Sequence, residues 1–543
     1  MAHPTPPPSL NAKLPHRLSP HASHDRSVFI ESPTILSPDT SVPNGNKGKA
    51  ADLSYLIISG GTGANSIASA FGHSPAFVLP VSDDGGSSSE ILRCFGGPSI
   101  GDIRSRLIRL IPLVSQPTSR DDRERLAIYN LLAYRFPARA AEKDVRDLWH
   151  EIVEGRSDLW DGIGEDKKEC IRAFLVHFQT LCLRRAHKRF SFRNFSLGNG
   201  FLTGARDLFG SLPSAIFLFK SIAGVNHGVQ VIPVINTNQT VTIAAQLANS
   251  TTLIGQCTIS HPAPPATPLA SGLSTPPPSS QQQYAGRPPP ASHSAIGKRV
   301  HLRRDSRTFD TPDNASLPAS RRDSFEEAHS GGGGIEQINE GEEGWAGGNI
   351  GYRKGEDETP LEARIERVFY INLYGQEIYP DPNSDFVDTL NQRDVLVYSC
   401  GSLWTSIIPC LALRGLAASI ASSQTLKAKV LLLNSSNDRE TPNYTASEYI
   451  ATILAMLRHY DKPKRNRHQD QLLPGPTWKT SDLISHVVHL EGASVEMDRE
   501  DIEASGIRIV SVPSSIHGSK DETPLFTPEG VEWAMERVLE GLS

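Results

Sequence analysis

Two short apolar runs near the start of this chain, Tyr55–Ile58 and Phe77–Val81, each break abruptly into glycine, serine or aspartate. A helix-like segment follows each break, which is the pattern of strand–loop–helix units. Such units build parallel sheets, in which ligands bind to the loops at the carboxyl ends of the strands. A third loop of this kind, Ser99–Arg104, lies close behind. The pattern predicts an α/β fold with a ligand site among these loops.

The first loop is rich in glycine, which lets the backbone come close to a ligand. A helix that begins at Asn65 would direct its N–H groups at an anion. A tight turn with nothing bound explains the motif almost as well. A dinucleotide site of the GxGxxG type is another alternative, with Asp83 about 20 residues on as the ribose-binding carboxylate, although Ser66 replaces the third glycine. The phosphate-cradle residues predicted here are Gly60, Gly61, Thr62, Gly63 and Asn65.

The second loop opens with two adjacent carboxylates, Asp83 and Asp84, and continues with two glycines and three serines. Carboxylates hold Mg²⁺, glycines allow a sharp backbone path, and hydroxyls donate to phosphate oxygens. We predict both aspartates as metal-binding or acceptor-activating groups, with Asp102 of the third loop as a second metal ligand. An acidic helix cap ahead of Glu90–Phe95 is the alternative. The further binding residues predicted in these loops are Gly85, Gly86, Ser87 and Arg104, the last as a bidentate partner of phosphate.

Three motifs in this order, SGGTG…N, VSDDGGS and GDIRSR, resemble the CofD-like superfamily, which holds 2-phospho-L-lactate transferases and bacterial gluconeogenesis-factor proteins. Two departures are Ser59, where many relatives have a third glycine, and Ser399–Cys400, which replaces Gly-Pro. The later segments that continue the resemblance are Phe195–Asn199, Val231–Pro233, Val241–Leu247, Leu253–Gln256, Ser399–Pro409 and Asn434–Thr441.

This resemblance implies binding of a nucleotide-linked small molecule. In the transferase branch it implies Mg²⁺-assisted transfer of a phospholactyl-type group from a guanosine diphosphate donor to a deazaflavin precursor. In the gluconeogenesis-factor branch it implies a non-catalytic sensor that binds a nucleotide sugar and regulates carbon metabolism. A plain NAD-binding protein is a third reading, and all three stay open here. The site residues that the resemblance adds are Asn199, Gly401, Ser402, Thr405, Ser406 and Asn434.

The predicted fold is three-layered and Rossmann-like, a mostly parallel sheet with helices on both faces. One domain spans residues 52–261 and 361–543, and a helical insertion with mixed charge occupies residues 120–190. Residues 1–51 and 262–360 are rich in proline and serine and poor in periodic apolar residues, so we expect disorder there. The later elements expected are strands at Val395–Tyr398, Val430–Leu433, Ser485–Leu490 and Arg508–Val512, and helices at Ala446–His459 and Pro528–Leu542.

Composition limits the classes of binding partner and the cellular location that we expect for this chain. A net charge of −6 and a pI near 6.3 give no reason to expect nucleic acid. Six cysteines without a CxxC pair read as reduced thiols, and the first residues lack the apolar core of a signal peptide. The uncharged stretch 395–413 reads as a strand, a polar loop and a helix start, so we expect no membrane span and a cytoplasmic location.

Two questions of partnership stay open at the sequence level. Nothing decides between a monomer and a homodimer. The repeated segments Arg303–Ser306 and Arg321–Ser324 are candidate sites for a basophilic kinase at Ser306 and Ser324, and compositional bias explains them about as well.

Overall fold

The computed structural model describes residues 35–36, 53–61, 63–86, 88–261, 360–461, 478–517 and 523–540. Two predicted site residues, Thr62 and Ser87, lie outside the described residues. So do the insertion 262–359, with Ser306 and Ser324, and the tail 1–51 except for β1 (Ile35–Leu36), which pairs in parallel with β4 (Leu113–Val114).

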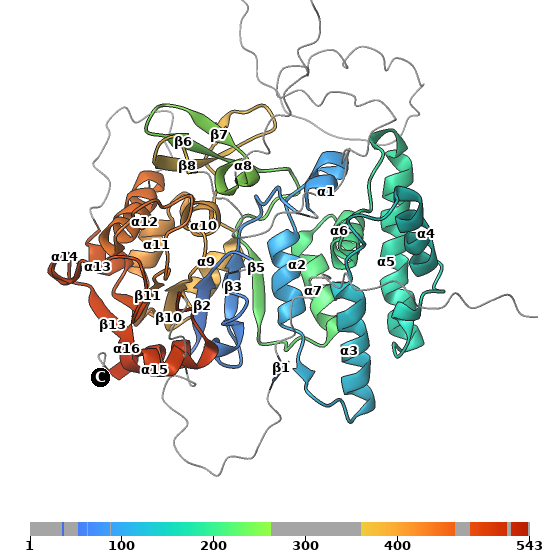
Figure 1. Cartoon of the computed structure of the whole chain (residues 1–543), viewed down its shortest axis with the longest axis horizontal. Helices are drawn as coiled ribbons and strands as arrows, with labels where there is room; N and C mark the ends of the chain where they lie inside the picture. Colours follow the sequence, from blue (N-terminus) through green and yellow to red (C-terminus); the bar gives the residue numbers. More distant parts are fainter. Residues whose placement is uncertain are drawn as a thin grey trace, which may run out of the picture. The chain divides into compact units, whose positions relative to one another are not determined.

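A seven-stranded sheet forms the centre of the fold (Figure 1), and every neighbouring pair in it is parallel. β2, β3 and β10 are buried along their whole length, as expected for strands covered on both faces. The strands, in spatial order, are β13 (Arg508–Val512), β12 (His486–Leu490), β11 (Ala428–Leu432), β10 (Val395–Tyr398), β2 (Tyr55–Ile58), β3 (Ala76–Leu79) and β5 (Gln230–Pro233). The predicted parallel α/β sheet is confirmed.

The strand order reverses between β2 and β10. From β2 the chain moves through β3 to β5, and from β10 it moves the other way through β11 and β12 to β13. The ends of the two central strands are level, because Ile58 is paired with Tyr398. The loops that follow β2 and β10 therefore diverge at a topological switch point, where open α/β sheets bind their ligands.

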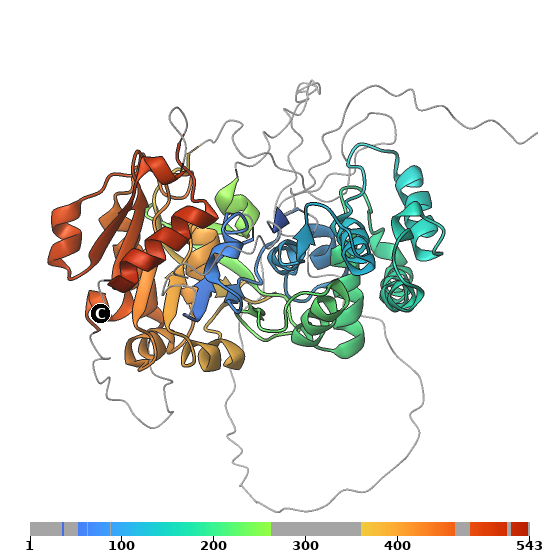
Figure 2. The ribbon, with the colours of Figure 1, turned by 90° about the horizontal axis from the view of Figure 1, so that it is seen from below.

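Helices cover both faces of this sheet. α16 packs against β13 and the 3-10 helix η2, while α9 packs against β5 and α11, and Figure 2 shows them on opposite sides. The helices are α1 (Ser88–Phe95), α2 (Gly101–Arg109), α6 (Leu197–Phe209), α7 (Leu212–Ala223), α8 (Gln256–Ser260), α9 (Ser384–Leu390), α10 (Ile408–Leu411), α11 (Leu416–Ser422), α12 (Ala446–Tyr460), α13 (Thr480–Leu483), α14 (Arg499–Ala504), α15 (Ser514–His517) and α16 (Pro528–Glu540).

The predicted helical region lies beyond the β5 edge (Figure 1) and is confirmed. Its core is aromatic: Trp149 stacks on Phe192 at 4.6 Å between ring centroids, and Phe178 stacks on Phe195 at 5.4 Å. α5 packs along α6, which joins this region to the rest of the fold. Its elements are α3 (Arg120–Ala133), α4 (Glu142–Val153), η3 (Asp158–Trp160), α5 (Glu165–Arg184) and η4 (Ala186–Lys188).

A second, antiparallel sheet was not predicted. It has the order β7-β6-β8-β9 and joins segments from both sides of residues 262–359. The Tyr370 hydroxyl of β8 donates to the carbonyl of Pro409, at 2.8 Å, which ties this sheet to α10. The strands are β6 (Thr242–Leu247), β7 (Thr252–Ile254), β8 (Ile365–Ile371) and β9 (Glu377–Ile378).

The helix predicted to begin at Asn65 is wrong. Turns follow the glycines, and among the described residues between β2 and β3 the helical piece is η2 (Ala68–Phe71), a four-residue 3-10 helix. Asn65 is buried instead, with its side-chain amide donating to the Ser105 hydroxyl at 2.9 Å. Asn65 is therefore bound to α2 and does not begin a helix.

The uncharged stretch 395–413 forms β10, the π-helix η5 (Leu403–Ile407) and α10, as the sequence indicated. Within the described ranges, no single helix is long and apolar enough to cross a membrane. One pair, Leu403–Leu411 with Leu416–Ser422, meets both criteria together but is bent by 76°.

Candidate functional site

The glycine turn after β2, residues 59–65, is held from below by Arg106 of α2. This guanidinium is fully buried and donates to the carbonyl of Ala64 at 3.0 Å, the hydroxyl of Ser59 at 3.2 Å and the carbonyl of Gly60 at 3.4 Å. It also stacks on the ring of Phe77, 4.5 Å from the centroid. A buried cation therefore binds the oxygen atoms of the turn and determines its path.

The same face of α2 also carries Asp102, whose carboxylate contacts the glycine turn. The backbone N–H of Gly61 donates to the Asp102 carboxylate, and a Cβ at Gly61 would overlap that carboxylate. Asp102, Ser105 and Arg106 follow the i, i+3, i+4 spacing that places side chains on one side of a helix. Sequence reasoning missed Ser105 and Arg106, although this spacing in GDIRSR signals both.

Arg104 projects from a different side of α2. It is buried against α6, where a Cβ at Gly198 would lie 3.2 Å from its side-chain carbons. Positions two apart on a helix do not face each other, so Arg104 and Asp102 leave α2 on different sides. Asn199, in the next position of α6, is fully buried. The role predicted for Arg104 stays a prediction, while the cation that the structure brings to the turn is Arg106.

The two adjacent aspartates of the second loop separate. Asp83 turns toward α2: a Cβ at Gly101 would lie 2.9 Å from its carboxylate, and its charge acts on Asp102. Burial and the neighbouring Asp102 hold the pKa of Asp83 well above its usual range. Burial also raises the pKa of Asp102 to about 6, with Arg106 opposing it. The facing acid pair is thus Asp83 with Asp102.

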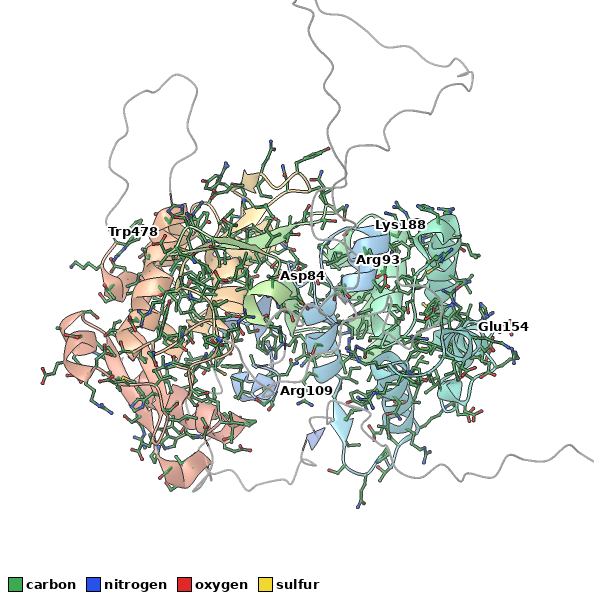
Figure 3. The ribbon with its side chains drawn as sticks, turned by 45° about the horizontal axis from the view of Figure 1, so that its top comes forward. Asp84, Arg93, Arg109, Glu154, Lys188 and Trp478 are labelled. Carbon is green, nitrogen blue, oxygen red and sulfur yellow. The ribbon has the colours of Figure 1, made fainter. Side chains whose placement is uncertain are left out.

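Asp84 turns the other way, to α8 of the second sheet region (Figure 3). Its carboxylate accepts the N–H of Cys257 at 2.9 Å, and a Cβ at Gly255 would overlap it. Gly255 has φ +91°, a conformation that favours glycine. Burial raises the pKa of Asp84, and hydrogen bonds from α8 oppose the rise. Asp84 therefore ties the second loop to α8.

Gly85 and Gly86 of the second loop are each required to be glycine for a different reason. Gly86 has φ +53°, and a Cβ at Gly85 would lie 2.7 Å from the Cys257 sulfur. The predicted sharp backbone path past α8 is present at these positions.

The loop after β10 meets the glycine turn directly. A Cβ at Gly63 would lie 3.1 Å from the Cα of Gly401, and a Cβ at Gly60 would overlap the Ser406 hydroxyl. Gly401 has φ +134°, which favours glycine. Ser402 is the N-cap residue of the π-helix η5, and its carbonyl accepts the N–H of Ser406 at 3.1 Å. Residues predicted from segments about 340 apart in the sequence are thus in contact.

The loop after β11 holds the β10 loop from the other side. The Asn434 side chain accepts the N–H of Gly401 at 2.9 Å and donates to its carbonyl at 2.8 Å. Glu440, 1% exposed, accepts the N–H groups of Trp404 and Thr405, both at 3.1 Å, and the Thr405 hydroxyl at 2.6 Å. Both donors of Thr405 are thus used inside the protein. Burial, with Asp438 nearby, raises the pKa of Glu440 to about 8.

Comparison with known proteins identifies the family of this chain. The family described as 2-phospho-L-lactate transferase CofD matches residues 56–515. The chain belongs to the CofD family. The uncharacterized protein YNL011C of Saccharomyces cerevisiae is 33% identical over 475 residues, covering 85% of this chain and 96% of the yeast protein.

Two solved structures resemble this CofD-family chain. The crystal structure of a UPF0052 family member from Bacillus halodurans has a TM-score of 0.49 at 16% identity and covers 89% of this chain and 99% of its own. A second structure of a B. halodurans protein has a TM-score of 0.45 at 16% identity, with 84% and 91% covered.

Asp83 and Asp102 of this CofD-family site suit a divalent cation better than the three predicted ligands Asp83, Asp84 and Asp102 do together. In the part of the chain that the structure describes, no group of three or more His, Cys, Asp or Glu side chains is arranged to hold a metal. Asp102 nevertheless has a buried carboxylate oxygen, Oδ2, with no hydrogen-bond partner, and it is close to the like charge of Asp83. Mg²⁺ usually takes one or two carboxylates together with substrate phosphates. Asp83 and Asp102 suit that role, whereas Asp84 is engaged by α8.

Glu440 was also missed among the predicted site residues of this CofD-family chain. Its signal was present in the Asn434–Thr441 segment, where a single glutamate lies six residues after the asparagine. A separate hollow on the helical region contains none of the predicted residues; it is lined by Arg123, Leu126, Ala127, Asn130, Asp158, Leu159 and Asp161.

Proposed function

We propose that this CofD-family protein binds a nucleotide diphosphate-linked substrate at the carboxyl edge of its parallel sheet and, with Mg²⁺, transfers a phospho-group from it. The observation that carries the proposal is the contact between the turn after β2 and the loop after β10 at the switch point, where Gly63 packs on Gly401. Glycine on both sides lets a phosphate chain approach two backbones at once.

The charges at this site support a metal-dependent form of binding. Asp102 already accepts the Gly61 N–H, and Asp83 faces Asp102. Two carboxylates repel a diphosphate unless a cation lies between them, because bound cations are the largest local charges in such sites. Mg²⁺ on this pair would supply charge neutralisation for the transferred group, which is most of what phosphoryl transfer asks of a protein.

In the proposed transfer, an acceptor hydroxyl attacks the distal phosphorus of the diphosphate, a new P–O bond forms, and the bridging P–O bond breaks to release the nucleoside monophosphate. The hydroxyl proton passes to a carboxylate, for which we propose Asp83. We propose a deazaflavin precursor as the acceptor class, because the resemblance of the sequence motifs to the transferase branch implies it.

A second candidate is a non-catalytic regulator that binds a nucleotide sugar. One observation favours it: Asp84, the second predicted catalytic carboxylate, accepts the Cys257 N–H and serves the contact with α8. In this case the site would bind the nucleotide without turnover.

Isothermal titration calorimetry with guanosine diphosphate, a UDP-sugar and NAD, each with and without Mg²⁺, tests the proposal. We expect guanosine diphosphate to bind only with Mg²⁺, and Asp102→Asn to weaken binding by about tenfold or more, as expected for the loss of a charged ligand. Asp147→Asn, an exposed aspartate on α4, is the matched control and should change nothing.

Other outcomes would contradict the proposal in defined ways. Binding of a UDP-sugar alone, with no transfer from a guanosine diphosphate-linked donor, would support the regulator. Binding of NAD alone would support the alternative of a dinucleotide site. If guanosine diphosphate, the UDP-sugar and NAD all fail to bind, the proposed nucleotide site is refuted.

A further inference from the structure

The loop after β10 is held in place by hydrogen bonds from one neighbouring segment, residues 434–440. Asn434 makes two of them to the main chain of Gly401, and Glu440 makes three to Trp404 and Thr405. Both residues follow β11, which is the neighbour of β10 in the sheet. The five bonds thus come from the side opposite to the glycine turn.

Glu440 supplies hydrogen-bond acceptors to N–H groups at the start of the helix η5. The first N–H groups of a helix have no acceptor within the helix. In η5 two of these groups, on Trp404 and Thr405, donate to one Glu440 oxygen, and the Thr405 hydroxyl donates to the other. Since Glu440 is almost fully buried, a ligand cannot take its place without unfolding the loop.

The segment 434–441, which carries Glu440, is stabilised by hydrogen bonds of its own. Asp438 accepts the N–H groups of Glu440 at 3.0 Å and Thr441 at 3.1 Å, and the Thr441 hydroxyl at 2.9 Å. Tyr449 of α12 contacts the Thr441 hydroxyl at 3.0 Å. The carboxylate of Glu440 is therefore presented by a turn that is bonded to itself and to α12.

The loop after β10 contacts the glycine turn on the side opposite to Asn434 and Glu440. Gly401 touches Gly63, and Ser406 touches Gly60, so the same loop forms one wall of the contact at the switch point. We infer that Asn434 and Glu440 are positioning residues of the nucleotide site: they hold residues 401–406 at the distance from the glycine turn that the phosphate chain needs. This inference rests on the proposed function.

The test combines amide hydrogen exchange on the free protein with calorimetric titration of guanosine diphosphate and Mg²⁺, at one pH. Glu440→Ala removes three bonds and Asn434→Ala removes two, so exchange of residues 401–407 should accelerate by about tenfold or more, in keeping with the loss of two or three hydrogen bonds to the main chain and the Thr405 hydroxyl. Nucleotide affinity should fall by a similar factor. Glu440→Gln keeps the acceptor oxygen for Trp404 and Thr405, so affinity should return to within about threefold of the native protein. Glu496→Ala, an exposed glutamate, is the matched control.

The outcomes separate the two proposals. Unchanged exchange at 401–407 in Glu440→Ala and Asn434→Ala would overturn the inference, whether or not a nucleotide binds. Faster exchange with unchanged affinity would also overturn it, because the bonds would then be structural only. If the native protein binds no nucleotide, the proposed function and the positioning role for it both fail, and the exchange result still decides whether the bonds hold the loop. Should Glu440→Ala not fold, Asn434→Ala, whose side chain is only half-buried, carries the test.

Discussion

The two loops that meet at the switch point are held by buried side chains of opposite hydrogen-bonding character. The turn after β2 presents carbonyl oxygens to a buried donor, the Arg106 guanidinium, while the loop after β10 presents N–H groups to a buried acceptor, the Glu440 carboxyl. A glycine-rich loop in this fold therefore owes its shape to a partner element, which is α2 for one loop and the loop after β11 for the other.

Removal of the cation is the most severe way to break this arrangement. Arg106→Ala leaves the carbonyls of Ala64 and Gly60 without their buried donor, and we expect a loss of about 3–5 kcal/mol in the free energy of unfolding. Arg109→Ala, on the same helix and half-exposed, should cost less than about 1 kcal/mol. Urea denaturation of both variants measures the difference, and equal losses would contradict the role given to Arg106.

The two acids behind these loops should leave different pH signatures. A carboxyl whose pKa is raised on folding is destabilising when ionised, so stability falls as pH rises from its unfolded to its folded pKa. For Asp102 that window is about pH 4 to 6, and for Glu440 about pH 4.5 to 8. Asp102→Asn should remove the first decline, up to about 3 kcal/mol, and Glu440→Gln the second, up to about 5 kcal/mol.

Thermal unfolding between pH 4 and 9 separates these contributions. Asp147→Asn serves as the control for a surface aspartate without such a decline. Curves of the two variants that run parallel to the native curve would show that neither acid has the raised pKa assigned to it. Added Mg²⁺ should reduce the decline in the native protein and not in Asp102→Asn.

The smallest effects come from the two glycines in contact, which have different reasons to be glycine. Gly401 has φ +134° with open space around its Cβ position, so Gly401→Ala should cost about 1–3 kcal/mol in backbone strain alone. A Cβ at Gly63 would press on Gly401 at 3.1 Å, so Gly63→Ala should cost about 1 kcal/mol and push the loops apart. The double variant should be non-additive because the residues touch. Chemical denaturation of the set checks this, and strict additivity would contradict the contact.

Much of the site could be found from local sequence. Apolar runs that end in glycine and aspartate mark the strands and their carboxyl ends, because strand period and turn chemistry are local properties. The strands Val395–Tyr398 and Arg508–Val512 have the predicted bounds. The missing helix at Asn65 and the second sheet could not be found in this way. At the first, Asn65 and the carbonyl of Ala64 bind residues of α2, about 40 positions later in the sequence, and the second pairs segments separated by residues 262–359.

Local sequence is enough to indicate a parallel α/β protein of the CofD family, with glycine and aspartate at the ends of β2 and β3 and glycine after β10. Which charged side chains lie together depends on the tertiary structure. Asp83 faces Asp102 and not its neighbour Asp84, and Arg106, which the sequence analysis did not single out, binds the oxygen atoms of the glycine turn. The reason is geometric: adjacent side chains in a loop point apart, whereas helix faces and strand order bring distant ones together.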